Sequence, residues 1–519
     1  MYAKIRGTVL HGVEAFPVTV EVNVGKGLGY FITGQPDDGV RESLSRIEVA
    51  IKSTGFSMPR EKLSVNLSPA HVRKTGAGFD LPIAIGILLA SGQVVDLGKL
   101  KDYILAGELG LDGSLYPVRG ALCMAYQALK DGIRGLVLPV VSAREAALLK
   151  GIEVIGVRHL REVLDFIQKD LVLPVGPTDT FSSDMGPPEG LADFRDVRGQ
   201  PRVKRALEIA AAGGHNILLI GPPGVGKSML AKRLPSILPP MSPGEVLETT
   251  RIYSVVGNGE SLQGLITARP FRNPHHTASD VALAGGGSLP LPGEISLAHN
   301  GVLFLDELYE FKRSAIEVLR QPLEEGCIRI ARAKMSLEYP ASFMLVAAMN
   351  PCFCGYFGHP TRPCICSKRA LEFYRQKASG PLLERIDLHV EAESLPLADL
   401  MNLRERNESS ADIRERVIGA RDIQSGRYEG LKGVHCNAQM PEQDMESYCR
   451  LERYAKNFLL KKIDELQLSA RSYNRILKLS RTIADLAGSD TIELEHGAEA
   501  VGLRCLDRAI GGVKSKSGH

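Results

Sequence analysis

Residues 221–228 read Gly-Pro-Pro-Gly-Val-Gly-Lys-Ser, and this segment constrains the fold more than any other part of the chain. An apolar run at 216–220 precedes it, and a helix-competent run at 228–234 follows it. Glycines let backbone N–H groups curl around phosphate oxygens, and the N-terminus of the next helix adds its partial positive charge. The pattern G-x-x-x-x-G-K-[ST] therefore predicts a phosphate-binding loop between a strand and a helix of an α/β domain.

The side chains of this motif have distinct expected roles. Lys227 is expected to reach the β- and γ-phosphates of a nucleotide, and the Ser228 hydroxyl is expected to bind Mg²⁺. The alternative is a chance match in a glycine-rich loop, and the flanking strand and helix argue against it. The other residues of the predicted phosphate loop are Gly221, Pro222, Pro223, Gly224, Val225 and Gly226.

Two further apolar runs, at 301–305 and 343–349, are followed by polar side chains. Ligands of parallel α/β sheets lie at the carboxyl ends of the strands. We expect Asp306 to complete the Mg²⁺ shell, Glu307 to polarise the attacking water, and Asn350 to orient that water. The alternatives are a solvated strand end for the acidic pair and a turn residue before a proline for Asn350.

The composition limits the class of protein. The chain is 519 residues long, and its 63 Lys and Arg against 60 Asp and Glu leave a formal charge of +3. This length favours three or four domains, and 44% hydrophobic with 24% charged residues excludes a mainly disordered chain. Because the net charge is small, a nucleic-acid surface would have to be local. With no signal peptide and no apolar stretch near the ~20 residues that cross a bilayer, we expect a cytoplasmic protein without membrane partners.

The pattern of residues changes along the chain and predicts an α/β protein of three domains. Residues 1–170 alternate like half-buried strands around a buried helix, and 171–190 form a Pro-, Gly- and Ser-rich linker. Residues 191–395 carry the phosphate loop, 396–510 are strand-poor and helical, and 511–519 read as a tail. Strands are expected at 18–25, 62–69, 135–139, 151–157, 216–220, 301–305 and 343–349, and helices at 81–92, 201–212 and 470–488.

Four of the nine cysteines fall within fifteen residues, as C-x-C-x₉-C-x-C. Nine cysteines are too few for a disulfide scaffold in a chain of this length. Four thiolates so close together in a reduced protein suit tetrahedral zinc, with unliganded thiols or a redox pair as the alternatives. The four candidate ligands are Cys352, Cys354, Cys364 and Cys366.

Several longer segments make the chain similar to a known family. Together with the phosphate loop, they resemble the AAA+ ATPases and, within these, the YifB/ComM family of magnesium-chelatase-like proteins. The resemblance implies an AAA+ core on a parallel sheet, a C-terminal helical lid, and ATP and Mg²⁺ as cofactors. The segments are DVRGQ at 196–200, RPFRNPHHTASDVALAGGG at 269–287, PGEISLAHNGVLFLDEL at 292–308, LRQPLEEG at 319–326, VAAMNPCFCG at 346–355, LLERIDLHV at 382–390 and SARSYNRILKLSRTIADL at 469–486.

AAA+ rings complete each nucleotide site with an arginine from the neighbouring subunit, which stabilises charge on the transferred phosphoryl group. By similarity, Arg385 is the candidate for this finger, and Arg471 is the candidate for the lid arginine that contacts phosphate in its own subunit. Arg475 competes with Arg471 for the lid role, and surface salt bridges are the plain alternative for each. A finger supplied in trans implies an oligomer, which we expect to be a homohexamer.

Residues 327–339 alternate like two short strands about a basic tip. In helicase-like relatives a hairpin at this place points into the ring pore, and the segment at 271–287 resembles an inserted loop that also faces the pore. Basic groups on a pore hairpin could track a phosphate backbone, and a solvated hairpin is the alternative. His275 and His276 are expected to pack this loop, since adjacent histidines rarely chelate one ion. The candidate DNA-contacting residues are Arg329, Arg332 and Lys334.

The first 170 residues resemble the Lon-protease-like fold found in this family, through the segments at 65–92 and 105–139. Active Lon-type proteases need a serine in the first of these segments and a lysine in the second, as a catalytic dyad. Here the two positions fall at Gly78 and near Leu122. The resemblance therefore implies no peptidase activity for this domain, and a scaffolding or interaction role instead.

The resemblance implies an ATP-hydrolysing ring motor on single-stranded or branched DNA, similar to the ComM-type helicases of branch migration in recombination and natural transformation. Two other functions stay open at this point. One is a chelatase-type subunit that assists metal insertion into a tetrapyrrole, although such subunits do not usually carry a Lon-like domain in front. The other is an ATP-driven remodeller of proteins, for which the missing dyad argues against self-contained proteolysis.

Overall fold

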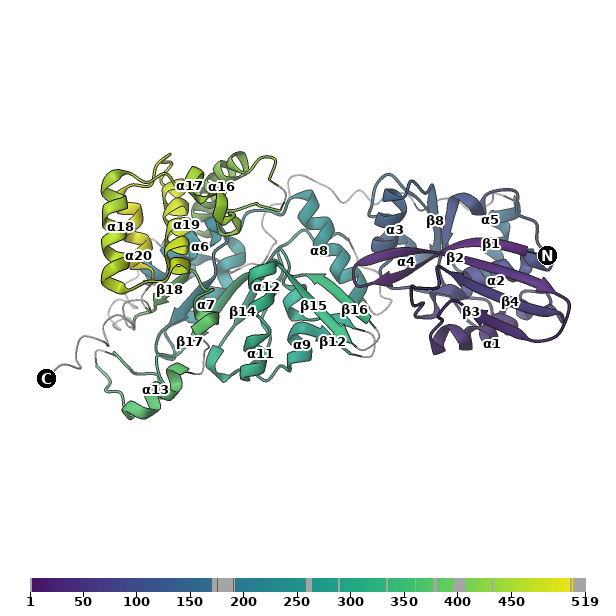
Figure 1. The fold of residues 1–519 in the computed structure, drawn as a ribbon, viewed down its shortest axis with the longest axis horizontal. Helices are drawn as coiled ribbons and strands as arrows, with labels where there is room; N and C mark the ends of the chain where they lie inside the picture. Colours follow the sequence, from purple (N-terminus) through teal and green to yellow (C-terminus); the bar gives the residue numbers. More distant parts are fainter. Residues whose placement is uncertain are drawn as a thin grey trace.

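The computed structural model describes residues 2–169, 175, 190, 192–257, 264–287, 290–332, 335–359, 361–376, 380–394, 407–431, 433–504 and 506. The molecule is elongated, with an N-terminal sheet at one end, a second sheet in the middle and a helical bundle at the other end (Figure 1). Among the described helices, none combines the length and the apolar character needed to span a membrane. Most of the expected linker at 171–190 and all of the expected tail at 511–519 lie outside the described residues.

The N-terminal part is built on a seven-stranded mixed sheet of order β3-β4-β2-β1-β5-β8-β9. Its strands confirm the alternating patterns in the sequence, and the helix expected at 81–92 is almost wholly buried, as its continuous apolar run predicts. The strands are β1 (Tyr2–His11), β2 (Glu14–Gly25), β3 (Tyr30–Thr33), β4 (Lys62–Ser68), β5 (Tyr103–Leu105), β8 (Gly135–Pro139) and β9 (Glu153–Val157), with a small hairpin of β6 (Glu108–Leu109) and β7 (Leu115–Tyr116). The helices are α1 (Asp38–Ser53), α2 (Asp80–Ala90), α3 (Ala121–Lys130), α4 (Val140–Ala146) and α5 (Leu160–Lys169).

The central part is built on a five-stranded sheet of order β11-β14-β17-β10-β18, in which every neighbouring pair is parallel. The parallel sheet expected around the phosphate loop is therefore confirmed. All residues of β10, β14 and β17 are buried, as the apolar runs predict. The strands are β10 (Ile217–Ile220), β11 (Phe271–Arg272), β14 (Val302–Leu305), β17 (Met344–Met349) and β18 (Leu388–Glu391).

Helices surround this sheet and two small hairpins extend from it (Figure 1). The expected hairpin at 327–339 is confirmed as β15 (Cys327–Arg332) and β16 (Met335–Pro340), and a second one pairs β12 (Gly285–Gly286) with β13 (Leu291–Pro292). The helices are α6 (Pro201–Gly213), α7 (Lys227–Arg233), α8 (Pro243–Val256), α9 (Asp280–Ala284), α10 (Glu294–Leu297), α11 (Arg313–Glu317), α12 (Arg320–Glu325), α13 (Lys368–Gln376) and α14 (Gly380–Leu383).

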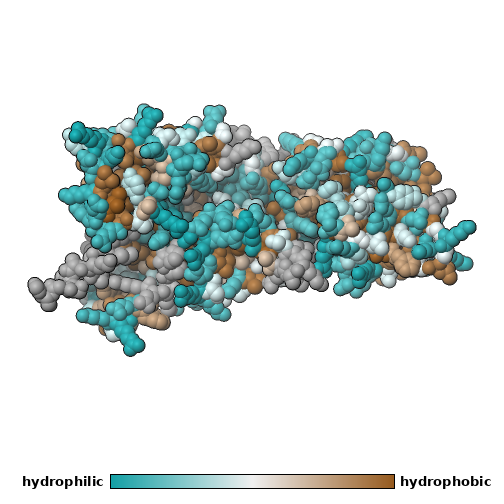
Figure 2. Space-filling model, viewed as in Figure 1, coloured by the Kyte–Doolittle hydropathy of each residue, from teal (hydrophilic) through white to brown (hydrophobic). Residues whose placement is uncertain are grey.

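The C-terminal part is helical among its described residues and packs on α6. Ile413 and Val417 on one side and Leu207 and Ala211 on the other belong to a common buried core. Exposed apolar side chains, among them Tyr454 and Leu460, lie on this bundle, and Figure 2 shows a hydrophobic patch over α18 and α20. The helices are α16 (Ser410–Arg427), α17 (Met445–Tyr448), α18 (Arg453–Leu466), α19 (Ala470–Leu486) and α20 (Leu494–Gly502). Short 3₁₀ helices lie at Ala77–Phe79, Leu100–Asp102, Phe194–Asp196, Leu234–Ser236, Leu308–Glu310, Asn437–Gln439 and Glu442–Asp444.

The N-terminal and central parts meet where α3 lies against α8. The Arg251 guanidinium stacks over the Tyr126 ring at 4.3 Å from its centroid and donates a hydrogen bond to the Val13 carbonyl at 2.7 Å. The Ser254 hydroxyl donates to the buried Glu145 carboxylate, and burial raises the pKa of that carboxyl. These contacts join the N-terminal part to the central part at α3 and α8.

Candidate nucleotide site

The predicted phosphate loop lies between β10 and the N-terminus of α7. Gly226 is the residue before the helix and has φ 90°, and Gly224 has φ 83°, a conformation that L side chains rarely adopt. A Cβ built on Gly224 would meet no heavy atom within 4 Å, so the backbone here faces open space. A glycine loop of this kind at the N-terminus of a helix suits phosphate oxygens.

Lys227 is buried in the loop with its ammonium held by neutral oxygens. Its Nζ donates to the carbonyls of Gly221 and Pro222 at 2.7 and 2.9 Å and to Asn350 Oδ1 at 3.1 Å. Burial lowers the pKa of Lys227, while the carboxylate charges of Asp306 and Glu307 oppose this shift. An ammonium in such a place gains by exchanging neutral oxygens for phosphate oxygens.

A hydroxyl and a carboxylate meet beside the loop. Ser228 Oγ donates to Asp306 Oδ2 at 2.5 Å, which brings the first residue after β14 to the start of α7. These oxygens are the hard ligands that Mg²⁺ prefers, so the donor set fits a magnesium-bound nucleotide. The next residue, Glu307, has a left-handed backbone at φ 53°, and its side chain is 56% exposed toward solvent.

The structure brings Asn350 to the same sheet edge. It follows β17, the strand between β14 and β10, and its side-chain oxygen accepts from Lys227. Its backbone carbonyl accepts a hydrogen bond from the Tyr374 hydroxyl of α13 at 3.0 Å. The residues that the sequence assigned to nucleotide and water therefore lie together, because parallel strands present their carboxyl ends at one edge.

His276 is a neighbour of this site that the sequence reasoning missed. Its Nδ1 lies 3.5 Å from Glu307 Oε2, whereas the expected role was only to pack the loop. The signal was weak, because β11 has two residues, yet β11 pairs in parallel with β14 and so ends at the same edge. The adjacent His275 instead bonds within its own loop, with Nδ1 2.9 Å from Thr277 Oγ1.

The candidate arginines have different surroundings. Arg385 is 7% exposed and forms an ion pair with Glu324 of α12. Arg475 forms an ion pair with Asp387 and donates to the Arg385 carbonyl at 3.0 Å, while Arg471 is exposed in the first turn of α19. Burial favours the neutral form of Asp387, but Arg475 and His215 outweigh it and hold the pKa well below its usual range.

The expected pore elements pack together. The Tyr339 hydroxyl of β16 donates to the Pro290 carbonyl beside β13 at 2.7 Å. Arg329 is exposed on β15 and forms ion pairs with Glu325 at 3.0 Å and Glu338 at 2.8 Å, so part of its charge is balanced locally. Lys334 and the side chain of Arg332 lie outside the described residues.

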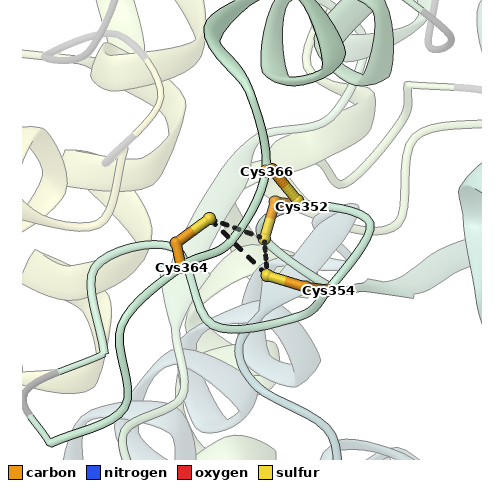
Figure 3. Close-up of side chains that lie close together, drawn as sticks. All are labelled: Cys352, Cys354, Cys364 and Cys366. Carbon is orange, nitrogen blue, oxygen red and sulfur yellow. Dashed lines mark hydrogen bonds between the residues drawn. The ribbon is translucent and has the colours of Figure 1, made fainter.

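The four cysteines expected to bind zinc converge after β17 (Figure 3). Their Sγ atoms all lie within 4.8 Å of one another, and the Cys352–Cys354, Cys354–Cys364 and Cys352–Cys364 distances are 3.3, 3.5 and 3.7 Å. A Zn–S length of about 2.3 Å gives a tetrahedron with edges of about 3.8 Å, close to these values. Backbone N–H groups of Tyr356 and Ile365 point at the Cys354 sulfur and lower its pKa to about 6.

The two dyad positions of the N-terminal part hold no nucleophile and no amine. Gly78 lies in a 3₁₀ turn, and Leu122 is fully buried in α3. The nearby Asp80 is buried and paired with Arg46 at 3.1 Å, and it also accepts from the Leu109 N–H at 3.2 Å. Desolvation raises the pKa of Asp80 to about 6, against the effect of Arg46.

Comparison with known proteins agrees with this geometry. The family described as magnesium chelatase, subunit ChlI, matches residues 193–400, and two related descriptions of the same subunit match 20–142 and 407–504. The chain is 42% identical over 501 residues to the uncharacterized protein YifB of Salmonella typhimurium, covering 96% of both proteins. The chain belongs to the YifB/ComM family of magnesium-chelatase-like proteins.

Other relatives support the same assignment. The competence protein ComM of Haemophilus influenzae is 42% identical over 502 residues, again 96% of each chain. The magnesium-chelatase 67 kDa subunit of Chlorobaculum parvum is 28% identical over 162 residues, which is 30% of this chain. The YifB/ComM family is of the AAA+ ATPase type, and ATP and Mg²⁺ are the cofactors that this membership implies.

Proposed function

We propose that the chain is an ATP-hydrolysing ring motor that acts on single-stranded or branched DNA, as a branch-migration helicase. The observation that carries the proposal is the 42% identity to a competence protein along 96% of both chains. The assembled nucleotide site supports its ATPase half. The hairpin β15–β16 supports its motor half, because it is present at the place where helicase-like relatives carry a pore hairpin.

The residues of the nucleotide site divide the work of hydrolysis. Bound Mg²⁺ would neutralise charge on the γ-phosphoryl group of ATP. Ser228 and Asp306 would hold this ion, and Lys227 would bind the phosphates. Glu307 accepts a proton from the attacking water, and Asn350 keeps that water in line with the γ-phosphate.

The ring completes each site. We propose a homohexamer in which Arg385 reaches the nucleotide of the neighbouring subunit and Arg471 contacts phosphate in its own subunit. Arg385 would leave its ion pair with Glu324 to do so. An arginine paired with a carboxylate cannot stabilise charge on a phosphoryl group. Hydrolysis would therefore require the contact between subunits that moves Arg385 from Glu324 to the nucleotide.

DNA is expected to contact the hairpin β15–β16 and the segment 271–287. His276 of this segment lies 3.5 Å from Glu307, so movement of the DNA-contacting loop reaches the candidate general base directly. Arg329, Arg332 and Lys334 would follow the phosphate backbone, giving binding that weakens with salt.

We propose that the chain divides into the three domains expected from the sequence, with a Lon-like N-terminal domain that has no peptidase activity. One pair of apolar cores lies within residues 3–167, and the other two lie mainly within 194–503. A scaffolding role agrees with the docking of α3 on α8. The four cysteines are proposed to bind one zinc ion in a structural site.

A chelatase-type subunit is the second candidate function. Its support is the match to descriptions of the magnesium chelatase subunit ChlI along the chain. The similarity to a chelatase subunit itself covers 30% of this chain, whereas that to the competence protein covers 96%. The motor on DNA is therefore the better supported proposal.

One experiment separates these functions. ATP hydrolysis by the full chain should be measured without DNA, with single strands, and with three- and four-way junctions. Lys227→Ala and Glu307→Gln serve as controls. We expect both kinds of DNA to stimulate hydrolysis and the junctions to be migrated. Hydrolysis that ignores DNA, together with junctions that do not move, would overturn the motor.

A further inference from the structure

The loop that carries the four cysteines, residues 351–366, lies between two parts of the nucleotide site. It begins directly after Asn350. At its first turn, Gly355 has φ 83°, and a Cβ built there would lie 2.6 Å from Pro223 Cδ of the phosphate loop. Only glycine allows this approach without a shift, so the cysteine loop rests directly on the phosphate loop.

Aromatic side chains connect the same loop to the end of β14. Phe353 packs edge-on against Tyr374 at 4.7 Å between ring centroids, and Tyr374 packs in the same way against Tyr309 at 4.6 Å. The Tyr374 hydroxyl holds the Asn350 carbonyl, and burial raises the pKa of that hydroxyl, so it stays protonated as a donor. The loop thus lies against the phosphate loop, follows Asn350 directly in the chain, and is linked to the end of β14 through Tyr374 of α13.

The cysteine loop has little apolar core of its own. Its large apolar side chains Phe353, Phe357 and Ile365 are 48, 42 and 87% exposed, and of the four cysteines only Cys352 is buried. A short segment without buried apolar area needs a cross-link to keep one conformation. The sulfur positions fit a tetrahedral metal ion, and such an ion contributes its binding energy to folding.

We propose that a zinc ion bound by Cys352, Cys354, Cys364 and Cys366 is a strut that holds Asn350 and the phosphate loop in register, so that zinc occupancy sets the rate of ATP hydrolysis. This inference rests on the proposed roles of Asn350 and the phosphate loop in hydrolysis. It does not depend on DNA. With four thiolate ligands the ion would keep no open position for nucleotide or water, so the four cysteines would act through the positions of other residues.

The test uses the purified full chain without DNA. Metal analysis is expected to find close to one zinc per chain, and replacement by Co²⁺ is expected to give the strong visible absorption of a tetrahedral thiolate site. The variant Cys354→Ser/Cys364→Ser should lose the metal and lower kcat by about tenfold to a hundredfold, the effect of small misplacement at a reacting centre. Cys449→Ser, directly after α17 in the helical part, is the matched control and should keep both zinc and rate.

A second measurement avoids the risk that the double variant fails to fold. Wild-type chain is titrated with a thiol reagent that releases zinc, and hydrolysis is followed together with released metal. Rate and zinc should fall together, and both should return after reduction and addition of ZnCl₂. The zinc site is wrong if metal analysis finds less than about 0.2 zinc per chain and a chelator removes none of it. The role of zinc in positioning Asn350 and the phosphate loop is wrong if the rate of hydrolysis stays within about twofold after zinc is lost. Failure of the DNA motor would show separately, as absent stimulation of a wild-type chain that still depends on zinc.

Discussion

The central and N-terminal parts of this molecule differ at the positions where catalytic groups are expected. In the central sheet, β10, β14 and β17 lead into the phosphate loop, Asp306 and Asn350, whose polar atoms contact one another around Lys227 and Ser228. In the N-terminal part, the two dyad positions expected from the Lon-like resemblance hold Gly78 and a buried Leu122. Polar side chains thus meet at the proposed nucleotide site of the central part, whereas the two dyad positions of the N-terminal part carry none.

The buried ionisable groups of the N-terminal and central parts also differ in the kind of partner they have. Asp80 and Glu145 of the N-terminal part are satisfied by partners inside the protein, Arg46 and the Leu109 N–H for the first, Ser254 and the Leu122 N–H for the second. Lys227 of the central part is held by neutral oxygens that a phosphate can replace. Polar groups that are fully paired tie the structure together, while groups with exchangeable partners are available for a ligand.

The largest expected effect tests this contrast directly. Lys227→Ala and Glu307→Gln should each lower ATP hydrolysis by about 10³- to 10⁴-fold, since each removes charge or a base at the reacting group. Gly78→Ser should leave hydrolysis within about twofold, because a Cβ there meets only the Val118 side chain at 3.6 Å. Steady-state ATPase assays measure these rates. A large loss of hydrolysis in Gly78→Ser would mean that this N-terminal position contributes to hydrolysis.

The second effect concerns the ring. Arg385→Ala should lower hydrolysis by about 10³-fold, the value of an arginine finger, while nucleotide binding is kept. Mixing Arg385→Ala chains with Lys227→Ala chains should restore part of the activity, because some mixed interfaces combine an intact loop with an intact finger. Recovery is read from the ATPase rate against mixing ratio. No recovery at any ratio means that Arg385 does not act in trans.

The third prediction concerns the contact between His276 of the segment 271–287 and Glu307 of the nucleotide site. His276→Ala should raise DNA-free hydrolysis by up to about fivefold, since it removes the ring 3.5 Å from Glu307, an exposed contact worth up to ~1 kcal/mol. DNA stimulation should shrink in the same proportion. His275→Ala is the matched control, because that ring bonds to Thr277 instead. Equal behaviour of the two variants would show that the contact with Glu307 has no role in hydrolysis.

The fourth effect lies in the docking surface and should spare hydrolysis. Arg251→Ala removes the stacking on Tyr126 and the hydrogen bond to the Val13 carbonyl, at a cost of about 1–2 kcal/mol. The N-terminal part should then unfold at a temperature lower by a few degrees and become more sensitive to protease. Calorimetry and limited proteolysis measure this, with ATPase activity expected to stay within about twofold. A tenfold loss of activity would mean that docking controls the nucleotide site.

Much of the central site was predictable because its signals are local. Glycine spacing, a Lys-Ser pair and apolar runs with polar ends are read directly from the sequence, and parallel pairing then brings Asp306 and Asn350 together. The four cysteines were also close enough in sequence to suggest one cluster.

What was missed depends on contacts between distant segments. The His276–Glu307 contact follows from a two-residue strand that no periodicity reveals. The Arg385–Glu324 ion pair and the docking of α3 on α8 join residues whose approach is set by packing of whole elements. No local spacing encodes such pairs, so the sequence led to residues that the structure brings together and not to the contacts that restrain them.

The last prediction concerns acidic pH. Titration of Asp80 should change the stability of the N-terminal part without changing hydrolysis near neutral pH. In the folded N-terminal part, desolvation raises the pKa of Asp80 to about 6, above its unfolded value of about 4. Folded protein therefore holds this proton more tightly, and the unfolding free energy from Asp80 falls as pH rises from about 4 to about 6. Asp387 of the central part has the opposite sign, because its lowered pKa gives stability that is lost only below about pH 4.

The two signs can be separated by one substitution. Asp80→Asn keeps a neutral group at this position, so unfolding of the N-terminal part, followed by hydrogen exchange in its α2 peptides, should lose its dependence on pH between 4 and 6. Peptides of β18 next to Asp387 should behave alike in both chains over this range, and ATPase activity near pH 7.5 should be unchanged. If wild-type α2 became more protected as pH rose from 4 to 6, the desolvation of Asp80 would not be the dominant force on its carboxyl. The conclusion that buried carboxyls of the N-terminal part stabilise the fold would then not hold for Asp80.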